Sequence, residues 1–120
     1  SYGPYSPAPV WNLWKSFGIE DAQMIGYCEE DCPVQTSDKD VKATVYLKKD
    51  KVLVALGNFG NIEKAVRLNF NWEKLGLQQD KVMIKAPVVN DFQNETIFQP
   101  GQSIPVKAKE GWLLIIEPKK

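Results

Sequence analysis

The sequence predicts an all-β fold, an antiparallel Greek-key β-sandwich of about seven or eight short strands with one short N-terminal helix. Short apolar or alternating segments recur at intervals of about ten residues, as in such sandwiches. Gly, Pro and Asn residues that favour turns separate these segments. The sequence also lacks the long helical segments that connect parallel strands, which excludes a parallel doubly wound sheet.

Length and composition predict one globular domain over residues 1–120. The chain has 43% hydrophobic and 25% charged residues, close to the averages of globular proteins. Its 15 basic and 15 acidic residues give a formal charge of zero, so no excess field attracts nucleic acid or an anionic membrane. No apolar run approaches the roughly 18 residues that span a bilayer. We therefore expect neither a nucleic-acid nor a membrane partner.

Residues 1–27 are predicted to be a connector followed by a helix. Residues 1–9 contain three prolines with Gly and Ser, which favours an extended segment. Apolar residues then recur at helical spacing: Val10, Leu13, Trp14 and Phe17. Trp11 widens this face, and Gly18 is placed to end the helix. Because so short a helix must pack on the sheet or on a neighbouring domain, Trp11, Trp14 and Phe17 are candidates for interdomain packing.

The next segment predicts a helical turn at Glu20 to Ile25 and then a polar loop from Cys28 to Asp40. A zinc site at Cys28 and Cys32 would need two further soft ligands, and the chain has no histidine and no other cysteine. A disulfide across this small loop and two reduced thiols both stay open. The carboxylates between the cysteines match no calcium-binding pattern and are interpreted as solvated charges. We predict no metal or cofactor site.

Residues 41–117 are predicted to form the sandwich, beginning with a hairpin of Val41 to Leu47 and Val52 to Leu56. The second of these strands is apolar on both faces, so we expect it in the middle of a sheet that is covered on both sides. A turn rich in Gly and Asn then leads to Val66 to Phe70, predicted as the adjacent strand. Its alternating residues predict one buried and one exposed face.

The remaining elements follow from shorter signals. Trp72, Leu75 and Leu77 predict one helical turn closed by Gly76. Pro100 and Gly101 mark a turn. The predicted strands are Val82 to Ala86, an edge continuation at Val88 and Val89, Glu95 to Phe98, Ser103 to Val106, and Trp112 to Ile116.

Two stretches carry a resemblance to a known group of enzymes. The run VKATVYLKKDKVLVALGNFGNIEKAVRLNFNWEKLGL, with the later Ile-Pro-Val strand and the Gly-Trp-Leu-Leu-Ile-Ile ending, resembles the C-terminal β-sandwich that follows the catalytic barrel in many glycoside hydrolases. The upstream stretch WKSFGIEDAQMIGYC resembles the last helix and exit segment of such a barrel. The similarity is strongest to large secreted Bacteroides-type proteins, including the glycoside hydrolase 123-like family.

The resemblance implies a C-terminal accessory domain that packs on the catalytic barrel of the same polypeptide and stabilises it. Catalytic residues of these enzymes come from the ends of the barrel strands, so no catalytic residue is assigned to this chain, and we do not expect it to be an enzyme by itself. The resemblance also implies a secreted, periplasmic or cell-surface location.

A carbohydrate-binding module is the alternative function. Sugar rings stack on exposed aromatic side chains that have polar neighbours. Trp72 and Phe92 are the first candidates for carbohydrate contact, and Phe98 is a further one. Asp91, Gln93 and Asn94 would supply hydrogen bonds. Each of these rings could instead belong to the core, where aromatic residues are common.

Overall fold

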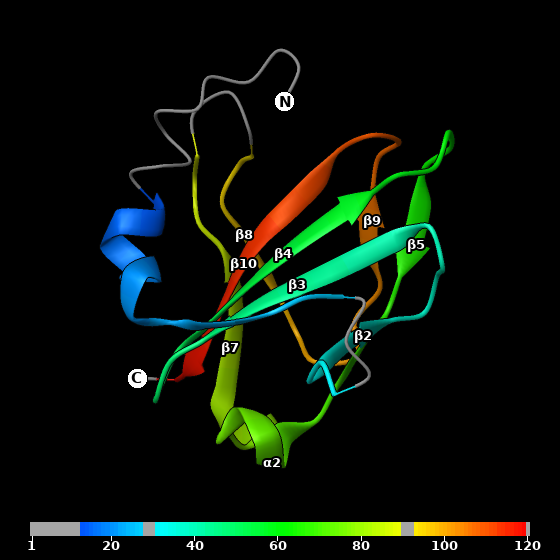
Figure 1. Cartoon of the computed structure of the whole chain (residues 1–120). Helices are drawn as coiled ribbons and strands as arrows, with labels where there is room; N and C mark the ends of the chain where they lie inside the picture. The colour runs from blue at the N-terminus through cyan, green and yellow to red at the C-terminus, as the bar shows by residue number, and fades with distance from the viewer. Residues whose placement is uncertain (1–12, 28–30, 90–92, 120) are drawn as a thin grey trace.

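The computed structural model describes residues 13–27, 31–89 and 93–119, which form a sandwich of antiparallel strands (Figure 1). Six strands make the larger sheet in the order β1-β3-β4-β10-β7-β8. Their bounds are β1 Gln23–Ile25, β3 Val41–Leu47, β4 Val52–Asn58, β10 Gly111–Pro118, β7 Val82–Ala86 and β8 Thr96–Phe98. The predicted all-β class is confirmed.

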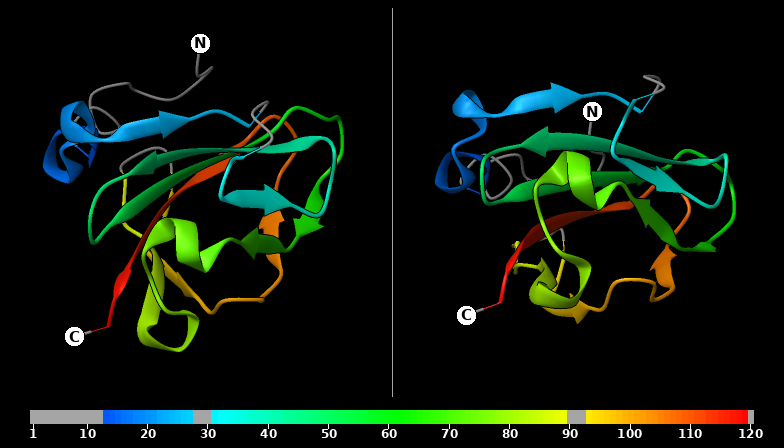
Figure 2. Two further views of the ribbon diagram at one scale, coloured as in Figure 1. Left: turned by 60° about the horizontal axis from the view of Figure 1, so that its bottom comes forward. Right: turned by 90° about the horizontal axis from the view of Figure 1, so that it is seen from below.

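Two short ribbons form the second layer. Strand β2 (Val34–Thr36) pairs with β6 (Leu68–Phe70), and β5 (Lys64–Val66) pairs with β9 (Ile104–Val106). The short helix α2 (Trp72–Leu75) follows β6, and the 3-10 turns η1 (Ile19–Asp21) and η2 (Gln79–Lys81) precede β1 and β7. Figure 2 shows the ribbons and α2 on one face of the six-stranded sheet and the N-terminal helix on the other.

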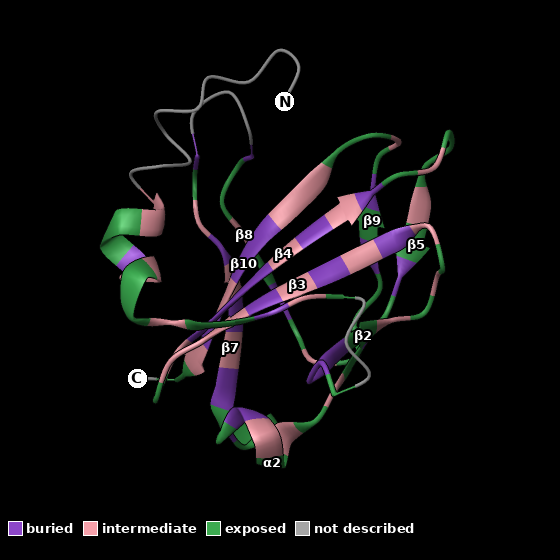
Figure 3. Ribbon diagram, in the orientation of Figure 1, coloured by how far each residue is buried: buried purple, intermediate pink, exposed green. Residues whose placement is uncertain are grey.

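Strand β4 lies inside the larger sheet, between β3 and β10, as its sequence predicts. Val52, Leu53 and Val54 are all fully buried, so both faces of this strand are covered. The pattern of buried residues along the neighbouring strands is visible in Figure 3. A strand can be apolar on both faces only where another layer covers each side of the sheet.

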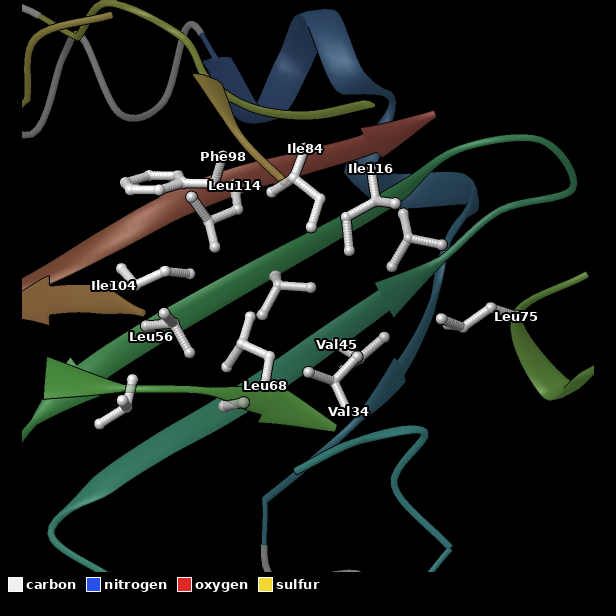
Figure 4. Close-up of a cluster of buried hydrophobic side chains, with 14 of the residues drawn as sticks. Val34, Val45, Leu56, Leu68, Leu75, Ile84, Phe98, Ile104, Leu114 and Ile116 are labelled. Atoms are coloured by element: carbon white, nitrogen blue, oxygen red, sulfur yellow. The ribbon is translucent and has the colours of Figure 1, made fainter. Parts of the chain in front are cut away.

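The main core fills the space between the two layers (Figure 4). Val45, Leu56, Leu114 and Ile116 of the larger sheet pack in one cluster with Val34, Leu68 and Ile104 of the ribbons. Each such aliphatic side chain contributes about 1.5–3 kcal/mol when it is fully buried. These contacts hold the ribbons, which have only three residues per strand, against the sheet.

A second, smaller cluster lies on the opposite face of the larger sheet, and we call it the outer-face cluster. Its buried members are Phe17, Leu53, Val89 and Leu113. Its half-buried members are Leu13, Trp14, Ile19, Ala22, Tyr46, Ala55 and Ile115. The N-terminal helix (residues 13–17) supplies Phe17 and ends at Gly18, whose φ of 84° is readily adopted only by glycine.

The structure corrects the prediction for residues 20–40. The segment predicted as a helical turn forms η1 and then β1, which pairs with β3. The segment predicted as a loop contains β2. The sandwich therefore includes strands that precede residue 41. Three-residue strands carry too few side chains to show an alternating pattern, so they were missed.

The prediction of one continuous strand from Val66 to Phe70 is also wrong. Val66 and Leu68 are buried and Arg67 is exposed, as the alternation predicts. The strand breaks at Arg67, whose backbone N–H donates to the Ser37 hydroxyl and whose carbonyl accepts from Ser37 N–H. The two halves pair with different partners, and neither is adjacent to β4 in the larger sheet. The predicted edge strand at Val88 and Val89 is an isolated bridge between Val89 and Gln93.

The helical turn predicted after β6 is confirmed. The Asn71 side chain accepts a hydrogen bond from Lys74 N–H, which caps α2, and Gly76 ends it with a φ of 72°. Within the described ranges, no helix is long and apolar enough to cross a bilayer.

Candidate functional site

Trp72, the first predicted sugar contact that the structure describes, is half-buried at the start of α2. Its ring stacks on Phe70 with ring centroids 4.5 Å apart and an interplanar angle of 27°. Both rings also pack against the main core. This arrangement favours a structural role for Trp72. Phe92, the second predicted contact, and its neighbour Asp91 lie outside the described residues.

Phe98 and Gln93 have structural contacts rather than a free binding surface. Phe98 is buried in the main core and meets the Trp112 ring edge-on at 5.3 Å. Gln93 is buried, and its side-chain nitrogen donates to the carbonyl oxygens of Pro87 and Leu113 at 2.6 and 2.9 Å. Neither side chain is available to a sugar in this arrangement.

Phe17, one of the residues predicted for interdomain packing, lies within the outer-face cluster and is only 2% exposed. The Lys48 ammonium donates to the Phe17 carbonyl oxygen at 2.9 Å and lies 5.6 Å from the ring centroid. Lys51 approaches the same ring at 5.9 Å. Phe17 therefore fixes the N-terminal helix to the sheet of this domain. Trp11 lies outside the described residues.

Trp14, another residue predicted for interdomain packing, is a half-buried member of the outer-face cluster. Its ring centroid is 5.8 Å from that of Tyr46 on β3. Met24 on β1 is directly opposite Tyr46 in the sheet register, and its side chain is 59% exposed. Half-buried members outnumber buried ones in this cluster. The sheet therefore presents a partly covered apolar surface beside the N-terminal helix.

A second surface feature was missed by the sequence reasoning, and we call it the Tyr27–Phe59 pair. The two ring centroids are 6.4 Å apart with an interplanar angle of 59°. The Tyr27 residue is 48% exposed and Phe59 is 59% exposed. Lys42 places its ammonium 5.5 Å from the Tyr27 centroid. The sequence signal that could have revealed it is the aromatic residue within the Gly-Asn-Phe-Gly-Asn turn. A ring in such a surface turn is expected to stay exposed, because the turn lies away from the core.

Two carboxylates that pair with lysines, Asp31 and Asp38, have lowered pKa values. A hydrogen bond from the Lys74 ammonium at 2.8 Å lowers the pKa of Asp31. The backbone N–H of Asp40, with the Lys64 ammonium at 3.2 Å, lowers the pKa of Asp38. A glycosidase general acid needs the opposite shift, a raised pKa that retains its proton near neutral pH. These two carboxylates are therefore unsuited to that role.

Cys32 is a free, buried cysteine whose thiol donates to the Val34 carbonyl oxygen at 3.4 Å. Cys28 lies outside the described residues. Across the described ranges, no three His, Cys, Asp or Glu side chains gather in a way that could hold a metal ion.

The comparison with protein families gives a match that spans nearly the whole chain. The family model described as glycoside hydrolase 123, C-terminal domain, matches residues 6–117. No match to a curated protein was found. The match therefore covers the outer-face cluster, both layers of the sandwich and the Tyr27–Phe59 pair.

Proposed function

The chain belongs to the family of C-terminal domains of glycoside hydrolase 123, and from this premise we propose that it is a non-catalytic accessory domain that packs on the catalytic domain and stabilises it. A C-terminal domain of a glycoside hydrolase implies a catalytic domain in the same polypeptide.

The partly covered outer face is the observation that carries the proposal. Trp14 and Tyr46 are half-buried members of the outer-face cluster, and Met24, which is opposite Tyr46 in the β1–β3 register, is 59% exposed. Exposed apolar surface of this kind marks protein interaction sites more often than isolated exposed residues do. Burying a methionine and part of a tryptophan against the catalytic domain would add several kcal/mol of apolar stabilisation, at about 25 cal/mol per Å².

The surface is also held in a fixed position. The Lys48 contact with the Phe17 carbonyl oxygen and the burial of Phe17 keep the N-terminal helix against Leu53 and Leu113. A preformed face loses less conformational entropy on association than a mobile one. The helix and β1 can therefore meet a neighbouring domain as one rigid surface.

Met24→Glu, introduced in the polypeptide that also carries the catalytic domain, tests the proposal. The charge would be buried without a partner at the interface, so we expect a lower thermal unfolding midpoint, by about 2–4 °C for each kcal/mol lost. Ile97→Glu is the matched control, because Ile97 is 52% exposed on β8, at the other edge of the same sheet.

In the 120-residue chain alone, both substitutions should change the free energy of unfolding by no more than about 0.5 kcal/mol. Equal effects of Met24→Glu and Ile97→Glu in the two-domain polypeptide would contradict docking through the outer face.

A further inference from the structure

The Tyr27–Phe59 pair is a surface feature that the core does not need. The Phe59 ring lies on the outer face of the larger sheet, where a Cβ atom built on Gly57 would be 3.7 Å from the ring. Lys42 is directly opposite Gly57 in the β3–β4 register and reaches the Tyr27 ring from the same face. Gly57 is in turn opposite Gly111 of β10, so two neighbouring positions of the sheet near the Phe59 ring carry no side chain.

The loop that presents Phe59 is rigid. The Asn58 side chain is buried, and its nitrogen donates to the carbonyl oxygens of Ile62 and Val106 at 2.9 and 3.0 Å. Its oxygen accepts from Gly60 N–H at 2.8 Å. These hydrogen bonds hold the loop in place, while the Phe59 ring, between Asn58 and Gly60, stays exposed.

The Phe59 backbone is anchored as well. Its N–H donates to the Asp40 carbonyl oxygen at 2.9 Å, and its carbonyl accepts from the Lys109 ammonium at 2.6 Å. Lys109 has a φ of 62°, in the left-handed region that non-glycine residues rarely adopt. Backbone strain of this kind concentrates at functional sites. The Phe59 loop is thus anchored in part by a residue of a separate turn, and that residue has a left-handed backbone.

A polar depression adjoins Tyr27, the member of the pair that contributes to its lining. Its volume is about 330 Å³, and its lining includes Tyr27, Gln35, Ser37, Lys39 and Lys42. The Gln35 side-chain nitrogen is engaged with the Cys32 carbonyl, which leaves its oxygen to accept. Ser37 accepts from Arg67 N–H and retains its hydroxyl hydrogen to donate. Lys39 forms no ion pair within the described ranges.

We propose that the Tyr27–Phe59 pair and this depression form a binding site for a neutral oligosaccharide, separate from the Trp14, Tyr46 and Met24 surface proposed for docking. A pyranose ring stacks its C–H face on the exposed rings, and the hydroxyl groups of the chain reach Gln35, Ser37 and Lys39. Aromatic side chains beside a hollow with a few fixed polar groups are typical of small-ligand sites. The centre of a protein interface, by contrast, is depleted of lysine and aspartate.

NMR titration of the 120-residue chain tests this site with three probes: cellotetraose, chitotetraose and β-1,4-galactotetraose. We expect saturable shifts in the backbone signals of Tyr27, Lys42 and residues 57–60 with at least one probe. Shifts centred on Trp72, or none with any probe, would overturn the proposal.

Ring-specific variants separate stacking from general hydrophobic contact. Tyr27→Ala and Phe59→Ala should each lower the affinity about tenfold, the loss expected from exposing one aromatic contact. Phe59→Tyr should retain the affinity and Phe59→Leu should lower it about as much as Phe59→Ala, because only the tyrosine keeps a flat ring. Ile62→Ala is the control, since Ile62 is an exposed aliphatic residue of the same loop.

The same ring variants in the two-domain polypeptide distinguish a sugar site from a second docking surface. Unchanged thermal unfolding with Phe59→Ala supports the sugar site. A lowered midpoint equal to that of Met24→Glu would instead assign the pair to the domain interface and overturn the proposal. If Met24→Glu does not lower the unfolding midpoint, the docking proposal fails, but the NMR test of glycan binding is still valid.

Discussion

The side-chain amide of Gln93 hydrogen-bonds both backbone polar groups of Leu113. Its nitrogen donates to the Leu113 carbonyl oxygen at 2.9 Å, and Leu113 N–H donates to its side-chain oxygen at 2.8 Å. Strand β7 pairs with β10 over Ile115 to Pro118. Beyond that pairing, the glutamine supplies the donor and acceptor that a neighbouring strand would otherwise provide.

Gln93→Leu should therefore destabilise the domain. The substitution leaves the backbone groups of Leu113 buried without partners, so we expect the free energy of unfolding to fall by about 2–4 kcal/mol. Urea denaturation measures the change. Gln79→Leu on exposed η2 is the control and should stay within about 0.5 kcal/mol. Similar losses in the two variants would show that the Gln93 contacts contribute little.

Gly111→Ala should be far more damaging than Gly57→Ala, although the two glycines face each other across β4 and β10. A Cβ atom at Gly111 would lie 1.9 Å from the Leu56 carbonyl oxygen, so the two strands would have to separate. We expect a loss of more than about 2 kcal/mol, against a change near zero for Gly57→Ala. The midpoint of chemical unfolding checks this, and an equal response would contradict the close strand approach.

Lys48→Met should loosen the N-terminal helix without disturbing the main core. It removes the hydrogen bond to the Phe17 carbonyl oxygen and the cation over the Phe17 ring. We expect a loss of about 1 kcal/mol and faster hydrogen exchange at Gly18 N–H, which bonds the carbonyls of Trp14 and Lys15. Lys49→Met, at an exposed neighbouring site, is the control. Unchanged exchange at Gly18 would count against the Lys48 contact.

Asp38 should make stability depend on acid pH. The Asp40 N–H and the Lys64 ammonium hold its folded pKa below the ordinary value of 3.8, so the ionised form favours folding. That contribution is complete above the unfolded pKa and is lost as pH falls through the folded pKa. The stability advantage of the natural chain over Asp38→Asn should therefore shrink as pH falls below 3.8.

Urea unfolding of both proteins between neutral and strongly acid pH measures this effect. Asp80→Asn is the control, because Asp80 forms no ion pair within the described ranges. A difference between the natural chain and Asp38→Asn that stays constant with pH would refute the assignment.

The elements that sequence reasoning predicted have strong local signals. Val52 to Leu56 is apolar on both faces, and only a strand inside a doubly covered sheet accommodates that pattern. Gly76 predicted the end of α2, and the Asn71 cap at its start is seen only in the structure. The outer-face role of Phe17 followed from helical spacing, although the sequence left open whether its own sheet or another domain would cover it.

The missed features depend on contacts between distant segments. The break at Arg67 comes from Ser37, which lies 30 residues earlier and gives no local signal. Strands β1 and β2 are three residues long and form because β3 and β6 offer them edges. The Tyr27–Phe59 pair likewise joins residues from separate turns. The Greek-key connectivity stays a prediction.

The position of β10 between β4 and β7 affects how the protein is made. Residues 111–118 leave the ribosome after both of those neighbours. Until β10 is synthesised, β4 and β7 each have an unpaired edge. Exposed strand edges pair readily with other chains. A ribosome that stalls before Gly111 would therefore release a product prone to aggregate.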